Sequence, residues 1–312
     1  MKIFNNLNLT KNYKKSVIAI GNFDGLHKGH KKVFYSAKKI AKKNKIKFGI
    51  LTFTPLPVMF FNKNITNYKI TSEKKKLELF KKNGVNFVLS IKFNKRFSKI
   101  TANKFIENII YKKINPKLIF VSHNFKFGNK RKGNVNLLKK LSKNYNYKLV
   151  KIKPQKYKDK IISSTRIRKS LQNGQPELAN RLLSRTWYIE GIVSKGKKLG
   201  RKLGYKTCNM QIRNYILPKM GIYAVKVLIG NKKKIYRGIA YLGSRPTFNG
   251  KKIFLETNIF NLNKNLYKKK LRVFFLQFVR GDKKFRNSEE LISQMNKDVI
   301  LVKKGLKTKL VL

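Results

Sequence analysis

The stretch of the chain that decides the fold is Gly21-Asn22-Phe23-Asp24-Gly25-Leu26-His27-Lys28-Gly29-His30. It follows the apolar run 17–20, which is typical of a short buried strand, and a helix is predicted to begin near Gly29. A strand that ends in a glycine-containing turn before a helix is typical of a parallel α/β sheet. Such sheets bind their ligands at the carboxyl ends of the strands.

This turn also carries two of the chain's three histidines, His27 and His30. Their spacing places them on one face of the first helical turn. The free N–H groups and the dipole of a helix N-terminus favour phosphate there, and the glycines let the backbone approach it. Both histidines can donate hydrogen bonds to a phosphate that gains negative charge. The pattern predicts a phosphate site, and the alternative is a pair of surface histidines beside an ordinary turn.

The chain has 312 residues, enough for about two domains, and its pattern changes near residue 185. Before that point, short apolar runs alternate with amphipathic stretches, which predicts βαβ units in a mostly parallel sheet. The predicted strands are 17–20, 48–53, 87–91, 118–121 and 147–152. The predicted helices are 29–43, 72–83, 101–113, 135–144, 165–172 and 176–183. The first domain is therefore expected to span residues 1–185.

Residues 186–312 are expected to form a second domain of a different class. Segments rich in Ile, Val, Tyr and Phe are separated there by turns of Gly, Asn and Lys, which predicts a small antiparallel β-barrel or β-sandwich. These segments are 187–193, 222–229, 234–242, 252–260 and 269–278. A closing helix is predicted at 288–302.

The charge of the chain is strongly positive, with 76 Lys and Arg against 12 Asp and Glu and a net charge of +64. A basic chain can bind nucleic acid through its phosphates. The lysines are, however, spread over every part of the sequence and form no single arm or stripe. We therefore expect solvated basic faces and no specific nucleic-acid partner, with nucleic-acid binding as the alternative.

Cysteine content and hydropathy exclude several further classes. Cys208 is the only cysteine, so the chain has no intramolecular disulfide and no cysteine-based zinc site. No apolar run is long enough for a signal peptide or a membrane span. A soluble cytoplasmic protein without a membrane partner, monomeric by default, is expected.

A second candidate site lies in the basic, glycine-rich stretch 191–210. Its four glycines alternate with Lys and Arg, so its backbone amides can face a phosphate. The alternative is a flexible basic turn between strands. Further along, Glu256 stands on an apolar strand of a chain that has few carboxylates. A glutamate so placed can serve as a general base, or it can be an ordinary surface residue.

A third motif is Ile162-Ser163-Ser164-Thr165-Arg166-Ile167-Arg168, which follows the last predicted strand of the first domain. Hydroxyls and backbone amides at a helix start, with Arg168 one turn later, suit a triphosphate. An ordinary N-cap with a solvated arginine is the alternative.

The motifs of the first domain together resemble a known family. His-x-Gly-His after a strand resembles the nucleotidyltransferase superfamily, and the longer string 21–30 resembles the FMN adenylyltransferase module of bacterial bifunctional riboflavin kinase/FAD synthetases. Segments 52–57, 93–106, 124–128 and 162–168 are similar to further motifs of that module, in the same order. The resemblance implies a Rossmann-like nucleotidyltransferase domain in which His27 and His30 act in adenylyl transfer. It implies ATP-binding residues Gly21, Asn22, Phe23, Asp24, Ser163, Ser164, Thr165 and Arg168, and flavin-binding residues Asn124, Phe125 and Phe127.

The second half resembles the riboflavin kinase of the same family, which implies a six-stranded antiparallel β-barrel. Segment 196–209 is similar to its glycine-rich signature, and 238–248, 254–258 and 280–285 are similar to three further motifs. The resemblance implies that Glu256 is the catalytic base and that Thr207 and Asn209 bind Mg²⁺. It implies ATP-binding residues Gly196, Gly200, Arg201, Thr207 and Asn209, and flavin-binding residues Arg280 and Phe285.

Several positions depart from the family pattern. Thr54 and Leu56 replace Glu and His, His123 replaces an acidic residue, and Lys206 and Cys208 replace Pro and Ala. The resemblance implies two reactions, in which ATP phosphorylates riboflavin to FMN and then adenylylates FMN to FAD. The alternatives are a chain that has kept one activity, or a basic nucleic-acid-binding protein on the same fold.

Overall fold

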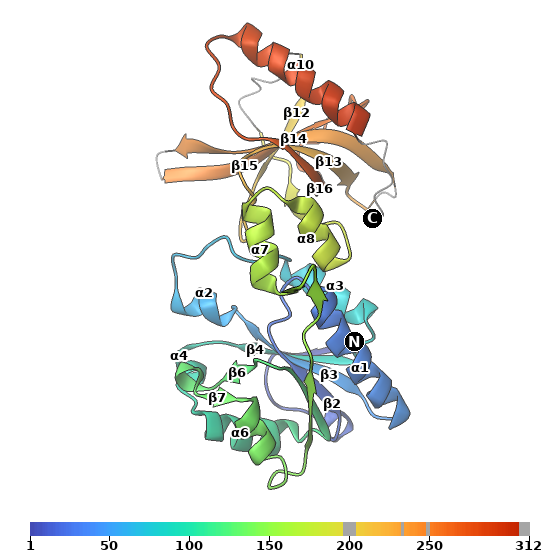
Figure 1. Cartoon of the computed structure of the whole chain (residues 1–312), viewed down its shortest axis with the longest axis vertical. Coiled ribbons are helices and arrows are strands. Elements are labelled where there is room, and N and C mark those ends of the chain that lie inside the picture. The colour runs from blue at the N-terminus through green and yellow to red at the C-terminus, as the bar shows by residue number, and fades with distance from the viewer. Residues whose placement is uncertain (196–203, 232–233, 248–249, 306–312) are drawn as a thin grey trace. The chain divides into compact units, whose positions relative to one another are not determined.

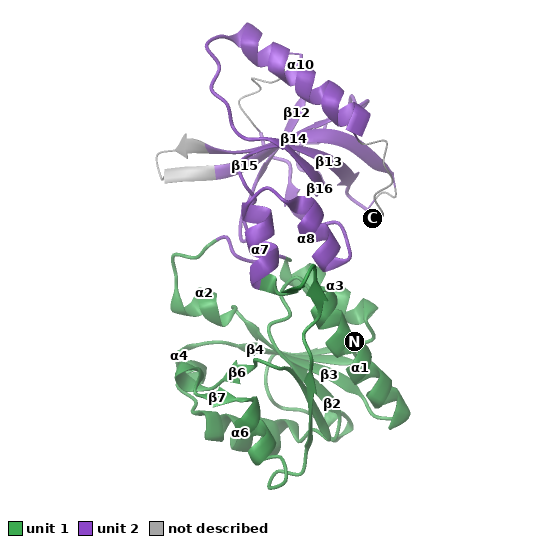
Figure 2. Cartoon of the chain, in the orientation of Figure 1, with its two compact units in different colours: residues 1–66, 71–164 green, residues 67–70, 165–312 purple. Residues whose placement is uncertain are grey.

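The computed structural model describes residues 1–195, 204–231, 234–247 and 250–305. It divides the chain into two compact units, which are coloured separately in Figure 2. Unit 1 comprises Met1–Thr66 and Thr71–Ser164, and unit 2 comprises Asn67–Ile70 and Thr165–Leu312. The predicted domain boundary at residue 185 stays a prediction.

Unit 1 contains a six-stranded parallel sheet with the strand order β1-β4-β3-β2-β5-β8. Its strands are β1 (Lys2–Phe4), β2 (Val17–Ile20), β3 (Phe48–Thr54), β4 (Phe87–Lys92), β5 (Leu118–Ser122) and β8 (Lys148–Ile152). The five predicted strands are confirmed. The sixth, β1, has only three residues, too few to give a distinct apolar run in the sequence.

Alternate residues of β2 enter two separate cores, one on each face of the sheet. Val17 and Ala19 pack with apolar residues of α1 (Lys28–Lys43) and α3 (Glu73–Lys82). Ile18 and Ile20 pack in the other core, which includes residues of the π-helical segment η2 (Phe105–Ile114) and of α6 (Val135–Lys140). Because both faces are covered, all four residues of β2 are buried, as in other doubly wound sheets (Figure 1).

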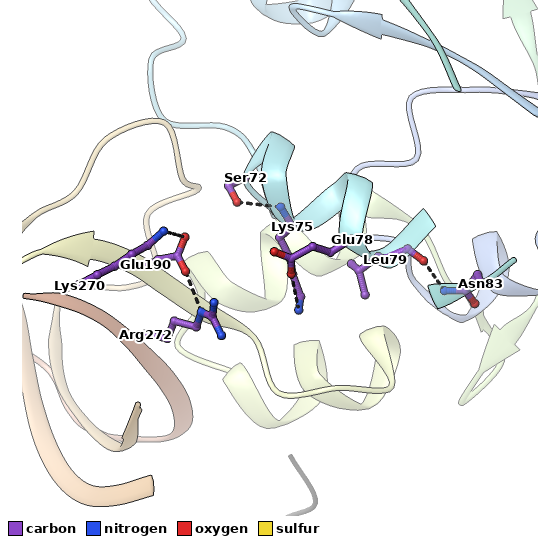
Figure 3. A network of polar contacts seen from close by, with 8 residues as sticks. All are labelled: Ser72, Lys75, Glu78, Leu79, Asn83, Glu190, Lys270 and Arg272. Carbon is purple, nitrogen blue, oxygen red and sulfur yellow. Dashed lines mark hydrogen bonds and ion pairs between the residues drawn. The ribbon is translucent and has the colours of Figure 1, made fainter. Parts of the chain in front are cut away.

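The remaining elements of unit 1 are short. They are η1 (Lys11–Tyr13), α2 (Pro57–Phe61), α4 (Lys95–Ser98), α5 (Ala102–Lys104), η3 (Asn129–Arg131) and the pairs β6 (Lys126–Phe127) with β7 (Gly133–Asn134) and β9 (Lys156–Tyr157) with β10 (Lys160–Ile161). The predicted helix 101–113 is thus a short α5 followed by η2. Helix α3 begins after Ser72, whose Oγ accepts a hydrogen bond from the Lys75 N–H at 3.2 Å (Figure 3).

Unit 2 is built on a six-stranded antiparallel sheet with the order β11-β16-β13-β14-β15-β12. Its strands are β11 (Tyr188–Ile192), β12 (Thr207–Gln211), β13 (Gly221–Ile229), β14 (Ile235–Thr247), β15 (Gly250–Ile259) and β16 (Lys270–Arg280). The first and last strands of this order meet where Ser194 bridges to Asn209, whose carbonyl accepts the Ser194 N–H at 2.9 Å. The sheet is therefore an almost closed barrel, as predicted.

Three helices accompany the barrel: α7 (Ser164–Gln172), α8 (Pro176–Leu183) and α10 (Ser288–Gly305). Asn180 of α8 donates from Nδ2 to the Phe275 carbonyl of β16 at 2.9 Å. Its Oδ1 accepts the N–H of Trp187, which is itself 1% exposed. Helix α8 is thereby fixed to the barrel at the point where the first barrel strand begins.

Glu190 of β11 lies between two cations of β16 (Figure 3). Its carboxylate meets Lys270 Nζ at 2.8 Å and Arg272 Nε at 2.7 Å. Burial opposes ionisation of Glu190, but the hydrogen bonds and charges of Arg272 and Lys270 outweigh it and lower the pKa of the carboxyl. The network ties neighbouring strands of the barrel together on one face.

Hydropathy along the helices bears on membrane insertion. Within the part of the chain that the structure describes, no helix combines the length and the apolar character that a membrane crossing requires.

Candidate active sites

The turn between β2 and α1 is shaped by three residues with left-handed backbone conformations. Gly25 has a φ of 83°, which glycine adopts without strain, while Phe23 and Leu26 have φ values of 49° and 37°. Burial holds the two apolar residues in place, since they are only 4% and 0% exposed. The Gly21 N–H donates to the Leu51 carbonyl on β3 at 3.1 Å. The chain therefore turns directly at the carboxyl end of β2 and enters α1 at Lys28.

His27 and His30 lie together at the start of α1, as their spacing predicts. His27 is the N-cap, and its Nδ1 accepts the His30 N–H at 3.3 Å. The two rings stack with their centroids 3.6 Å apart. A Cβ on Gly29 would lie 3.1 Å from His27 Cε1, so glycine leaves room for the imidazole. Because Nδ1 is an acceptor, a neutral His27 carries its proton on Nε2 and can donate it to a ligand.

Asp24 fixes the same turn from the inside. It is 4% exposed, and its Oδ1 accepts hydrogen bonds from the N–H and the hydroxyl of Thr71 at 3.3 and 3.4 Å. Thr71 Oγ1 in turn accepts the Gly25 N–H at 3.2 Å, and the hydroxyl of Ser164 donates to the Asp24 carbonyl at 2.8 Å. The structure thus brings together two predicted ATP-binding residues, Asp24 and Ser164. Sequence reasoning missed Thr71, because nothing in the sequence relates it to a residue 47 positions earlier.

Arg168, predicted to bind the triphosphate, is buried in unit 2. Its Nε donates to the Tyr68 carbonyl at 2.9 Å, and its guanidinium lies 3.7 Å above the centre of the Tyr68 ring. These two contacts hold the arginine in one orientation on α7. Nothing in the sequence pointed to Tyr68. Contact with ATP stays a prediction for Arg168, Ser163 and Thr165.

The predicted flavin-binding loop of unit 1 has one buried and one half-buried aromatic ring. Phe127 is 7% exposed and contacts Phe105 of η2 at a centroid distance of 5.2 Å. Phe125 is half-buried and stacks on Phe127 at 5.5 Å with an interplanar angle of 18°. Asn124 is exposed and contacts the Ser122 hydroxyl at 3.1 Å. Phe127 therefore belongs to the core and supports Phe125, the ring that keeps an accessible surface.

The barrel places the predicted kinase residues on one face through its strand register. Asn209 of β12 is directly opposite Glu256 of β15, and Thr207 is opposite Asn258. Opposite residues of antiparallel strands, and residues two apart on one strand, point to the same face. Thr207, Asn209 and Glu256 therefore share the outer face of the barrel, since the intervening Leu255 and Thr257 are fully buried inside it.

A pocket opens beside this face. It is lined by residues 206–209, by residues 262–267 and by Val193 and Ile259. Cys208 also borders it, and burial raises the pKa of the thiol to about 11, so the sulfur stays protonated at neutral pH. The predicted ATP-binding residues Gly196, Gly200 and Arg201 lie outside the described residues.

Arg280, predicted to bind flavin, holds helix α10 through its guanidinium. Its Nε and Nη2 donate to the Asp298 carboxylate at 3.0 and 2.8 Å, and Asp298 is 4% exposed. Gln294 Nε2 donates to the same carboxylate at 2.9 Å. The guanidinium also lies 5.8 Å from the ring of Phe285, the second predicted flavin residue. The structure thus brings the two predicted residues, Arg280 and Phe285, together. Sequence reasoning missed Asp298, the carboxylate partner of Arg280.

Two family models match the chain, one in each half. The FAD synthetase model matches residues 9–166 and the riboflavin kinase model matches residues 183–306. The chain is 42% identical over 300 residues to the bifunctional riboflavin kinase/FMN adenylyltransferase of Buchnera aphidicola subsp. Schizaphis graminum, covering 95% of this chain and 96% of that protein. This chain belongs to the bifunctional riboflavin kinase/FMN adenylyltransferase family.

Other comparisons agree with this family. The family member of Escherichia coli strain K12 is 32% identical over 282 residues, with 90% of each chain covered. A crystal structure described as a macrolide-efflux protein from Streptococcus pneumoniae superposes with a TM-score of 0.83 at 28% identity, covering 96% of this chain and 98% of that one. The family and the two-part fold predicted from the sequence are therefore confirmed. Matches in both halves support the bifunctional prediction over its single-activity and nucleic-acid-binding alternatives.

Proposed function

We propose that this family member makes FAD from riboflavin in two ATP-dependent steps, one in each half of the chain. The observation that carries the proposal is that each matched half contains its own set of converging polar groups. In unit 1 these are His27 and His30 at the β2–α1 turn, and in unit 2 they are Thr207, Asn209 and Glu256 on one barrel face. The adenylyltransferase domain corresponds to residues 1–185 and the kinase domain to residues 186–312.

In the kinase step, Glu256 orients the 5′-hydroxyl of riboflavin and accepts its proton. The hydroxyl oxygen forms a bond to the γ-phosphorus of ATP, the bond from that phosphorus to the β–γ bridging oxygen breaks, and FMN and ADP result. Arg280 and Phe285 contact the flavin, and residues Gly196, Gly200 and Arg201 contact the phosphates of ATP.

The donor set on β12 fits Mg²⁺. Thr207 and Asn209 offer oxygen atoms on one strand face, and Mg²⁺ prefers oxygen ligands, usually a few from protein with the rest from phosphate and water. Cys208, which stands between them, alternates to the other face of the strand, and its thiol stays protonated. When bound, Mg²⁺ neutralises phosphate charge and orients ATP.

In the adenylylation step, a phosphate oxygen of FMN forms a bond to the α-phosphorus of ATP. The bond from that phosphorus to the α–β bridging oxygen breaks, and pyrophosphate leaves. His27 and His30 donate hydrogen bonds to the charge that develops on the phosphates, while Asp24, Ser163, Ser164, Thr165, Arg168 and residues 21–23 hold ATP. Asn124 and Phe125 form the flavin side of the site, and Phe127 supports the ring of Phe125 from the core. Neither step needs a covalent enzyme intermediate.

The partners of the chain are its small-molecule substrates riboflavin, FMN and ATP, and no specific nucleic acid is among them. A single chain carries both sites. We place it in the cytoplasm because ATP is a substrate of both steps.

The test is a time course with purified protein, riboflavin and Mg-ATP, with riboflavin, FMN and FAD separated by chromatography. We expect FMN to appear first and FAD to follow. A preparation that converts supplied FMN to FAD but makes no FMN, or the reverse, would contradict the bifunctional proposal.

A further inference from the structure

The pocket beside β12 is called the kinase pocket below. Lys206 lines it and stands where the family pattern has a proline. It immediately precedes Thr207, and both line the pocket beside β12. The opposite wall is formed by residues 262–267, which follow the end of β15 at Ile259. The pocket therefore joins two segments that are more than 50 residues apart in the sequence.

The side chain and the main chain of Lys206 each form a hydrogen bond with a residue in or just after β15. Its Nζ donates a hydrogen bond to Asn263 Oδ1 at 2.7 Å, directly across the pocket. Its carbonyl accepts a hydrogen bond from Asn258 Nδ2 at 2.8 Å, beside the pairing of Thr207 with Asn258. A proline would keep the carbonyl acceptor and fix φ, but it could not reach the opposite wall.

The hydrogen bond leaves the charge of Lys206 available to a ligand. Asn263 is neutral, so it holds the ammonium group without neutralising it, and an ammonium has three N–H donors of which Asn263 takes one. Lys264 lines the same pocket and adds a second positive charge. A pocket with these charges beside Thr207 and Asn209 favours an anionic ligand such as a nucleotide.

We propose that Lys206 is a positioning residue for the nucleotide of the kinase reaction, acting by holding the wall 262–267 against β12 through Asn263. This inference rests on the proposed function, because the nucleotide is that of the kinase step. The inference goes beyond the proposed function because it assigns a role to Lys206, which departs from the family pattern, and to its partner Asn263. Lys206 does not touch the reacting atoms, so it affects nucleotide affinity and leaves the chemical step largely unchanged.

The test compares Lys206→Met, Asn263→Ala, their combination and Lys264→Met in the full-length protein. We expect each of the first two to raise the KM for Mg-ATP in FMN formation by about 3- to 10-fold, as loss of one hydrogen bond of ordinary net strength does, with kcat within about 2-fold of wild type. The double variant should be no worse than Lys206→Met alone, because Asn263→Ala then removes a bond that is already lost. Calorimetric titration with ADP gives the same comparison without turnover.

Lys264→Met is the matched control, since it removes one charge from the same pocket and leaves the bond in place. If Lys206→Met and Lys264→Met raise the KM equally while Asn263→Ala keeps the wild-type value, Lys206 acts through charge alone and the proposal is wrong. Additive effects in the double variant would also overturn it. FAD formation from supplied FMN in the same preparations reports on folding of the other half. A wild-type chain that makes no FMN would overturn the proposed function instead.

Discussion

The candidate sites in the two units are held by different means. In unit 1 the polar groups lie in a turn whose shape is fixed by buried contacts, with His27 5% exposed and Asp24 4% exposed. In unit 2 the corresponding groups lie on the outer face of barrel strands, where Thr207 and Glu256 are half-buried and Asn209 is buried, and strand register places Asn209 opposite Glu256. The first site therefore depends on local backbone shape, and the second depends on the pairing of β12 with β15.

This difference has a consequence for how each site responds to substitution. A residue of the β2–α1 turn contributes both to the shape of the turn and to the chemistry, because Asp24, Thr71 and Ser164 hold each other through a chain of hydrogen bonds. A residue on the barrel face can change its side chain while the ladder of backbone hydrogen bonds stays intact. Variants of the barrel face are therefore expected to separate chemistry from folding more cleanly.

The largest expected effect is that of Glu256→Gln, which tests the barrel face. Glutamine keeps the shape of the side chain but cannot accept the proton of the riboflavin hydroxyl, so FMN formation should fall by about 10²- to 10⁴-fold. FAD formation from supplied FMN should not change, because that reaction belongs to the other half. Both rates are measured in one preparation. Unchanged FMN formation would make Glu256 an ordinary surface carboxylate, and loss of both rates would indicate a folding defect.

The next effect is that of His27→Ala and His30→Ala, which test the turn. Removal of a preorganised donor to the phosphate should lower FAD formation by about 10²- to 10³-fold, with FMN formation close to wild type. His27→Ala also removes the N-cap acceptor and should lower stability by about 1 kcal/mol for that reason, a loss that His30→Ala avoids because it keeps the cap. Urea unfolding measures that difference. Wild-type FAD formation in the double variant would exclude the pair from the mechanism.

A third comparison concerns what fixes α10 to the barrel. Asp298→Ala leaves the guanidinium of Arg280 without its carboxylate partner, and we expect a loss of about 3 kcal/mol in the free energy of unfolding. Lys297→Ala, at an exposed neighbouring position of the same helix, should change stability by less than about 0.5 kcal/mol. Equal midpoints of urea unfolding for the two variants would show that the ion pair contributes nothing net.

The smallest expected effect is the pH dependence contributed by Glu190. Its pKa is lowered in the folded state, so its stabilising contribution is present above the ordinary value of 4.5 and is lost as the pH falls through the folded-state pKa. Glu190→Gln should cost about 1 kcal/mol at pH 7, as partly exposed ion pairs do, and the cost should begin to fall near pH 4.5 and vanish only below the lower folded-state pKa. Urea unfolding at a series of pH values checks this. A cost that stays constant down to acidic pH would show that Glu190 acts through packing.

The sequence by itself determined the features that depend on residues close to one another along the chain. The apolar runs at β2, β3, β4 and β5 were predicted as strands because strands that are mostly buried on both faces are nearly continuous apolar runs, whereas β8, which was also predicted, is half-buried or exposed throughout. The contact between His27 and His30 was predicted because residues three apart in a helix share a face. Strand β12 was missed, since its sequence Thr-Cys-Asn-Met-Gln is half polar and follows a glycine-rich stretch that was interpreted as a loop.

Only the tertiary structure decided which distant residues meet. Nothing in the spacing of Asp24 and Thr71, or of Tyr68 and Arg168, predicts their hydrogen bonds, because these pairs form where the folded chain returns to the same place. The same holds for Arg280 with Asp298 and for Lys206 with Asn263. Asn209 lies opposite Glu256 only because β12 pairs with β15 in one register, and a shift of one residue would turn these side chains to opposite faces. Local periodicity therefore revealed the elements, while strand order and register assembled the sites.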